Sequence, residues 1–172
     1  VLCFQALGGI TSVLIQLSTG YMQIEPMVYL KTLAINSIAF ILMGGLALVL
    51  QVFTNNKFVG YGLLLLVLGA QIALGLMDFT HNLYTYSSAP NASYSDMNGY
   101  GHFLNAQFWF QAYWAVFLLI LMLLASAFWV RGVSPTWRER VTLAKHRLQG
   151  KAGVALLVSM LVFIGMGSYI FY

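Results

Sequence analysis

Residues that could do chemistry are scarce in this sequence, and three of them lie close together in a polar stretch that reads YSDMNGYGHFL, from Tyr94 to Leu104. Asp96, Asn98 and His102 supply a carboxylate, an amide and an imidazole. Carboxylate and imidazole groups are ligands that proteins use for Zn²⁺ and related metals. Asp and Asn ahead of glycine also form tight, hydrogen-bonded turns. The stretch therefore has two interpretations, a metal site and a structural turn.

A metal site would need further ligands, and the sequence offers His81 and Asp78. Only these two have the i, i+3 spacing that one turn of helix brings onto a common face. A haem held by paired histidines is disfavoured, because no histidine lies in the middle of an apolar run. A small membrane enzyme or redox protein using His81 and His102 is an alternative. The chain contains no HExxH, GxSxG or Walker lysine motif, so we predict no catalytic residue in it.

Composition places the chain among membrane proteins. Of its 172 residues, 60% are hydrophobic and 7% are charged, and the mean hydropathy is +0.83. Soluble domains carry about 25% charged residues, and eight Lys and Arg with four Asp and Glu are too few to cover one. The single cysteine, Cys3, excludes an internal disulfide and a cysteine-based metal site. The sequence therefore predicts an all-α, polytopic membrane protein.

Apolar runs define the elements that would position these side chains. A helix needs about 20 mainly apolar residues to cross the hydrocarbon core, and four runs meet this length, at about 29–53, 58–79, 106–130 and 151–172. A weaker run at about 1–17 is expected to be the second half of a span, because the chain begins inside it. We therefore predict about five transmembrane helices, the first one truncated, in a single transmembrane domain of residues 1–172.

The positions of Lys and Arg predict the orientation of these spans. Basic residues that flank spans are retained on the cytoplasmic side, and residues 131–151 hold six of the eight. That segment is therefore expected to be cytoplasmic, which puts the loop 80–105 and the C-terminus outside. The outer loop contains no Lys or Arg, as this orientation requires. Lys31 is the exception, and its long side chain can reach the outer interface.

Residues 132–150, within the cytoplasmic segment, are predicted to form a basic amphipathic helix. Ser134 is a good N-cap, Pro135 suits the first helical position and Gly150 suits the end. The apolar stripe consists of Trp137, Val141, Ala144 and Leu148. Such a helix can lie on the anionic inner leaflet or contact a cytoplasmic partner. The candidates for partner contact are Trp137, Arg138, Arg140, Lys145 and Arg147.

The outer loop 80–105 alternates Tyr with Ser, Asn and Gly, a mixture typical of a packed and hydrogen-bonded surface loop. We expect it to form a folded cap at the membrane surface, which acts as a gate or as a dock for a further domain. The candidate contact residues are Tyr84, Tyr94, Asp96, Asn98, His102 and Trp109.

Polar residues at or near membrane depth usually face the interior of a helix bundle. Interhelical hydrogen bonding is the simpler role for them, and a lining of a substrate path is the alternative. These residues are Asp78, Gln51, Gln71, Gln107 and Gln111. Glycines within the runs predict close approaches between helices. They are Gly44, Gly45, Gly60, Gly62, Gly165 and Gly167.

Four short motifs together resemble one known family. They are E-P-x-x-Y-L-K at 25–31, N-K-F-x-G at 56–60, H-N-L-Y at 81–84 and S-D-M-N-G-Y-G-H-F at 95–103. With them the chain resembles the permease portion of a bacterial ABC exporter of the type-2 (ABC-2-like) class. The likeness is to the large permeases that continue into an aminopeptidase N-like zinc peptidase domain. The final GSYIFY resembles the stretch that leads into that domain.

The resemblance implies partners and a location. It implies a separate cytoplasmic ABC ATPase subunit, a second permease copy as a dimer, and the lipid bilayer of the bacterial cytoplasmic (inner) membrane, with no nucleic acid. ATP would be bound by the partner subunit and zinc only by the downstream domain, so no cofactor is expected in this segment. The peptidase motifs are absent here, so no catalytic residue carries over. The alternative is a membrane anchor that holds an outer peptidase and transports nothing.

Overall fold

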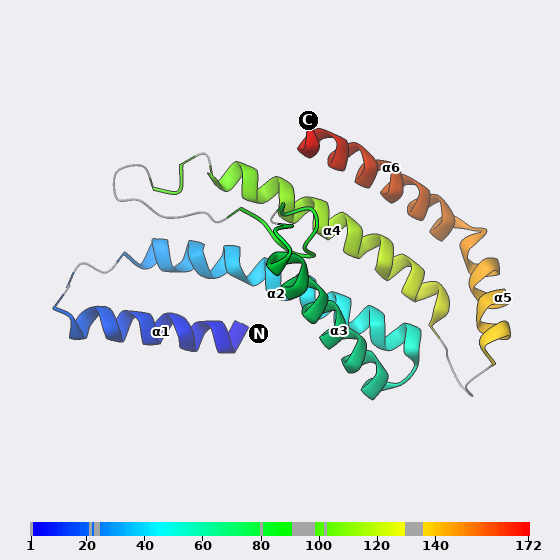
Figure 1. The fold of residues 1–172 in the computed structure, drawn as a ribbon, viewed down its shortest axis with the longest axis horizontal. Helices are drawn as coiled ribbons and strands as arrows, with labels where there is room; N and C mark the ends of the chain where they lie inside the picture. The colour runs from blue at the N-terminus through cyan, green and yellow to red at the C-terminus, as the bar shows by residue number, and fades with distance from the viewer. Residues whose placement is uncertain are drawn as a thin grey trace. The chain divides into compact units, whose positions relative to one another are not determined.

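The computed structural model describes residues 2–20, 22, 25–79, 81–90, 99–101, 103–129 and 136–172. These residues form six α-helices and no strand (Figure 1). The helices are α1 (Leu2–Ser18), α2 (Pro26–Thr54), α3 (Lys57–Leu76), α4 (Phe103–Phe128), α5 (Trp137–Leu148) and α6 (Lys151–Phe171). The chain divides into two compact units, unit 1 from Val1 to Met43 and unit 2 from Gly44 to Tyr172. The boundary falls inside α2.

Four of the described helices, α2, α3, α4 and α6, are long and apolar enough to cross a membrane. Each coincides with one predicted span, with ends that differ by a few residues. Helix α1 is apolar but has 17 residues, fewer than the roughly 20 that a full span needs. The prediction of an all-α chain with four membrane-length helices is therefore confirmed.

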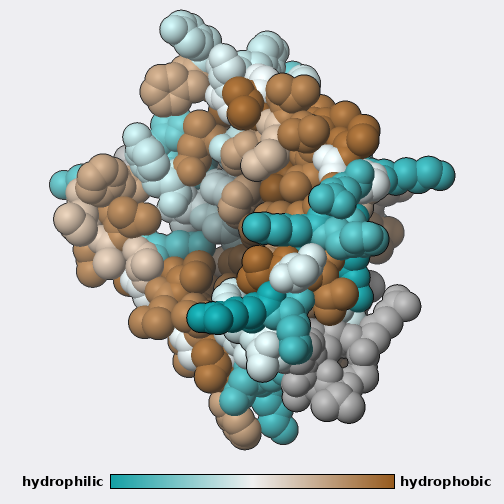
Figure 2. Space-filling model, turned by 90° about the vertical axis from the view of Figure 1, so that its right-hand side faces the viewer, coloured by the Kyte–Doolittle hydropathy of each residue, from teal (hydrophilic) through white to brown (hydrophobic). Residues whose placement is uncertain are grey.

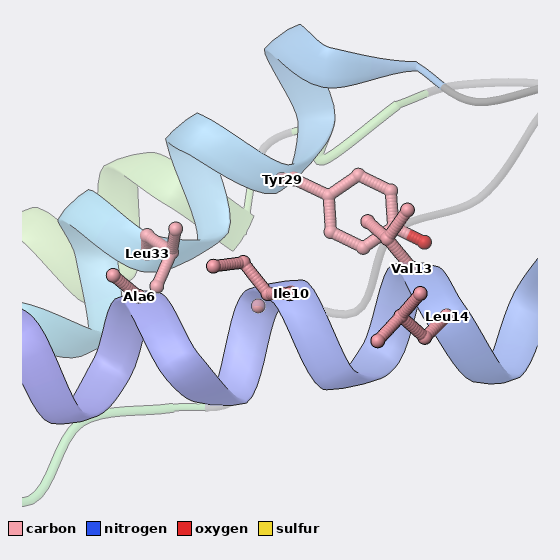
Figure 3. A pocket seen from close by; sticks show the side chains of 7 residues that line it. Ala6, Ile10, Val13, Leu14, Tyr29 and Leu33 are labelled. Atoms are coloured by element: carbon pink, nitrogen blue, oxygen red, sulfur yellow. The ribbon is translucent and has the colours of Figure 1, made fainter.

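Unit 1 pairs α1 with the first part of α2. A Cβ atom on Gly9 would lie 3.4 Å from Leu33 Cδ1, so a small residue lets the two helices approach here. The Tyr29 hydroxyl donates to Gln16 Oε1, and the Ser37 hydroxyl lies 2.5 Å from Gln5 Oε1. Figure 3 shows Tyr29 and Leu33 reaching from α2 toward α1, where they line a crevice of about 340 Å³.

In unit 2, a tight turn joins α2 to α3. Asn55 adopts a left-handed backbone with φ of 52°, a conformation that Asn tolerates better than most residues. Asn56 then caps α3, because its Oδ1 accepts a hydrogen bond from the Phe58 N–H at 3.0 Å. The turn folds α3 back along the second part of α2. A Cβ on Gly60 would lie 2.8 Å from Gln51 Cγ, so this position admits only glycine without a shift.

The predicted glycine contacts are confirmed at three of the six positions. Besides Gly60, a Cβ on Gly45 would lie 2.5 Å from Leu118 Cδ2, and one on Gly167 would lie 3.2 Å from the Tyr113 ring. Gly44, Gly62 and Gly165 have no atom within 4 Å of such a Cβ among the described residues. One glycine of each pair thus faces a neighbouring helix and the other does not, because residues one or two apart lie on different faces of a helix.

Helices α4 and α6 lie side by side through aromatic rings (Figure 1). Tyr113 stacks on Phe163 with ring centroids 4.4 Å apart, and Trp109 meets Tyr169 at 5.1 Å. Such ring pairs contribute about 0.5–1.5 kcal/mol beyond the area that they bury. This seam brings α6 back along α4 and leaves the short helix α5 at their shared turn.

Helix α5 begins later than the sequence predicts. Its N-cap is Thr136 rather than Ser134. The Thr136 N–H donates to Glu139 Oε2 at 3.0 Å, which is one half of a capping box. This carboxylate three residues beyond the cap offers a stronger signal than the Ser-Pro pair. Ser134 and Pro135 lie outside the described residues.

Candidate functional site

Only part of the predicted outer-loop site falls within the described residues. Tyr94, Asp96, Asn98 and His102 lie outside them. Tyr84 is 55% exposed and Trp109 is 36% exposed. Trp109 faces α6 through Tyr169, and the Tyr84 ring lies 5.7 Å from that of Phe79. The gate or docking role of this set stays a prediction.

Residues 81–90, one described part of the predicted outer loop, pack on α4. The Trp114 Nε1–H donates to the Ser88 carbonyl at 3.1 Å, and the Ser88 hydroxyl donates to Asn82 Oδ1 at 2.7 Å. Tyr86 is 8% exposed, and its ring lies edge-on to Trp114 at 5.2 Å. Burial raises the pKa of Tyr86 to about 12. A folded segment over α4 is thus present in these residues.

Sequence reasoning missed Tyr86 and Trp114, which hold this segment in place. The Tyr-x-Tyr pattern does not distinguish Tyr84 from Tyr86. Tyr86 is the buried one because the turn directs its side chain toward α4. The available signal was the Trp114 indole N–H in an apolar run, because a buried indole normally finds a hydrogen-bond acceptor. The acceptor here is a backbone carbonyl, which the sequence does not mark.

The described neighbours of the His81 ring are aromatic. Its ring centroid lies 5.8 Å from that of Tyr84 and 6.3 Å from those of Phe110 and Phe171. Its Nδ1 accepts a hydrogen bond from the Leu83 N–H at 3.2 Å. Asp78 and His81 are three residues apart but do not share a helix face, because α3 ends at Leu76. Within the described ranges, no three His, Cys, Asp or Glu side chains are grouped as metal ligands.

The glutamines of the spans turn toward neighbouring helices. Gln111 is 7% exposed, and Gln51 packs against Gly60. Gln71 Nε2 and Gln107 Oε1 are buried and have no hydrogen-bond partner within the described part of the chain. An unsatisfied amide atom costs about 1–3 kcal/mol. The inward placement of the glutamines agrees with the prediction, whereas Asp78 is exposed. Neither of these two amide atoms makes an interhelical bond within the described residues.

Arg140 on α5 is the most highly connected charged side chain among the described residues. It is 7% exposed. Its Nη2 donates to the Val52 carbonyl at 2.8 Å and to the Phe128 carbonyl at 3.2 Å, and its Nη1 donates to the Phe53 carbonyl at 3.3 Å. These carbonyls belong to the last turns of α2 and α4, where helices leave acceptors without an intrahelical donor.

Arg147 makes the same kind of contact with the C-terminal end of α4. Its Nη1 donates to the Trp129 carbonyl at 2.7 Å and to the Ala127 carbonyl at 3.0 Å. A cation near a helix C-terminus is favoured by the helix dipole, by about 0.3–1 kcal/mol at exposed sites and more when partly buried. Arg140 and Arg147 together form a clamp, which we call the arginine clamp, on the ends of α2 and α4.

Aromatic rings support the arginine clamp. Trp137 stacks on Phe128 at 6.0 Å with an interplanar angle of 21°, and Phe128 meets Phe53 at 5.4 Å. The Arg140 guanidinium carbon lies 5.4 Å from the Trp137 ring centroid, within cation–π range. Ala144, one turn beyond Arg140, is 2% exposed. The inner face of α5 is therefore fixed by packing and by hydrogen bonds.

The clamp corrects the expected face of α5. Arg140 was expected among the polar, outward residues, and it is buried because its guanidinium is needed by carbonyls on two other helices. Arg147 is exposed but engaged. Trp137, Arg138 and Lys145, the other members of the candidate set, are exposed as well. Figure 2 views the side on which α5 lies and shows long hydrophilic side chains over a hydrophobic surface.

Comparison with known proteins adds no family to this geometry. No family model, curated protein or solved structure matches the chain.

Proposed function

We propose that this chain is the membrane-spanning permease segment of an ABC-type exporter, driven by a separate cytoplasmic ATPase subunit and paired with a second permease copy. The observation that carries the proposal is the arginine clamp. Because Arg140 and Arg147 join α5 to the ends of α2 and α4, a force applied to α5 reaches two membrane-length helices together. The four motifs described above support the same family.

A docking surface for the ATPase is available on the outer face of α5. Arg138 and Lys145 are exposed there, beyond the residues of the clamp. The positive charge of this helix favours the cytoplasmic side, which is where an ATPase would meet ATP. In this proposal the partner binds ATP and this segment carries no catalytic group. The segment 80–105 and the C-terminus lie outside, and the membrane is the bacterial inner membrane.

The test is purification of the full-length protein with whatever binds it, followed by mass spectrometry and an ATPase assay. We expect a stoichiometric nucleotide-binding subunit. Arg138→Glu and Lys145→Glu should each weaken its retention by about tenfold or more, because charge reversal at an interface costs on the order of 1–3 kcal/mol. Lys31→Glu makes the same charge change on the opposite side of the membrane and should leave retention unchanged.

The alternative is a membrane anchor for an outer peptidase domain. It would be supported if no nucleotide-binding subunit accompanied the protein in intact membranes or in detergent. Retention that survived both α5 variants would instead move the docking surface away from α5.

A further inference from the structure

A crevice lies in unit 2 where α2 and α4 end. Its volume is about 370 Å³, and its lining residues are Leu48, Gln51, Val52, Asn55 and Trp129. Leu48 is 60% exposed and Trp129 is 56% exposed, so its apolar rim is accessible. Gln51 and Asn55 add two amide groups on the α2 side. A lining that combines apolar side chains with two amide groups suits a ligand with both an apolar and a polar part.

The arginine clamp gives this crevice a positive charge. Arg140 Nη2 lies 2.8 Å from the carbonyl of Val52, and Arg147 Nη1 lies 2.7 Å from that of Trp129. Two of the five lining residues are thus in direct contact with a guanidinium group. The acceptors are neutral carbonyls, so the hydrogen bonds leave both positive charges uncancelled. Arg140 Nε is buried and has no hydrogen-bond partner among the described residues.

Other basic residues near the crevice add further positive charge. Lys57 follows Asn55 at the start of α3, and Arg138, Lys145 and Lys151 lie on or next to α5. The acidic residue of α5 is Glu139, and its carboxylate accepts the N-terminal hydrogen bond of that helix from Thr136. An anion in the crevice would therefore meet a net positive potential.

We propose that this crevice binds an anionic phospholipid. Its phosphate lies beside the amides of Gln51 and Asn55, in the field of the arginine clamp, and an acyl chain runs along Leu48 and Trp129. Tryptophan is enriched at the level of lipid headgroups, and basic pockets between membrane helices bind anionic headgroups. The lipid would bridge α2 and α4 at the junction that the clamp holds. The proposal stands whether the chain transports or only anchors.

The test measures quenching of Trp129 fluorescence by brominated lipids. The full-length protein is reconstituted with brominated phosphatidylglycerol or brominated phosphatidylcholine at equal mole fraction, and the signal of Trp129 is taken as the difference between wild type and Trp129→Phe. We expect phosphatidylglycerol to compete for the site about fivefold better, a preference that falls as salt is raised.

Asn55→Asp supplies the variant, because it places a negative charge on the crevice wall and keeps a side chain that tolerates the left-handed backbone. It should abolish the preference. Asn82→Asp, the same change on the outer loop, should preserve it. Equal quenching by the two lipids, or a preference that is insensitive to Asn55→Asp and to salt, would overturn the proposal. If Asn55→Asp did not fold, the salt dependence of the wild-type preference would decide. Displacement of phosphatidylglycerol by an acidic peptide would reassign the crevice to a protein partner.

Discussion

Arg140 shows how one side chain can determine the position of a helix. A guanidinium group presents five N–H donors in a planar fork, and three carbonyls from two helices lie within reach of it. An ammonium group has three donors on a flexible stem and cannot span the same acceptors. The identity of the residue therefore matters as much as its charge.

We predict that Arg140→Leu lowers the free energy of unfolding by about 1–3 kcal/mol, because buried carbonyls lose their donor. Arg140→Lys should fall between the wild type and the leucine variant. Arg138→Leu, which removes an exposed arginine two residues away, should change stability by no more than about 0.5 kcal/mol. Thermal unfolding in detergent, followed by circular dichroism, measures all three. Equal losses for Arg138→Leu and Arg140→Leu would contradict the clamp.

Tyr86 carries the pH-dependent prediction. Burial raises its pKa from 10.0 to about 12, so the unfolded chain releases the phenolic proton first. The neutral form stabilises the fold fully below pH 10, and this stability is lost as the pH rises toward 12. Near-ultraviolet tyrosinate absorbance of wild type minus Tyr86→Phe should show a late step. The exposed control Tyr84→Phe should retain that step.

At the scale of elements, composition was enough to locate the membrane-length helices. The signal is local, because a run of about 20 apolar residues can be recognised without knowing the rest of the fold. The inward face of α5 was harder to predict, since two of the three acceptors for Arg140 lie 87 and 88 residues away in the sequence. A partial signal existed in the four-residue spacing of Arg140, Ala144 and Leu148, which places the arginine on the same stripe as two apolar residues.

The corner between α5 and α6 depends on Gly153. A Cβ there would lie 1.9 Å from the Leu148 carbonyl oxygen, which is a backbone atom and cannot rotate away. We predict that Gly153→Ala destabilises the protein by about 1–3 kcal/mol. Gly165→Ala, in the same helix with no described atom within 4 Å, should be neutral or stabilising by up to about 1 kcal/mol. Similar unfolding midpoints for the two variants would refute the tight corner.

At the scale of the whole molecule, the proposed topology separates two exposed residues across the membrane. Tyr84 belongs to the segment proposed to be outside, and Lys145 to the helix proposed to be inside. In a Cys3→Ser background, we predict that Tyr84→Cys reacts with a membrane-impermeant maleimide in intact spheroplasts. Lys145→Cys should react only after lysis. The reverse pattern would invert the topology and remove the basis for a cytoplasmic partner at α5.

The arginine clamp also has a consequence for biosynthesis. Arg140 follows Val52 by 88 residues, which at about 5–20 residues per second is a delay of about 4–18 seconds between synthesis of the acceptor and of its donor. Throughout that interval the end of α2 must keep its carbonyls in contact with water or with the insertion machinery. Docking of α5 onto the end of α2 is therefore a late step of folding, because it cannot begin before residue 140 has been synthesised.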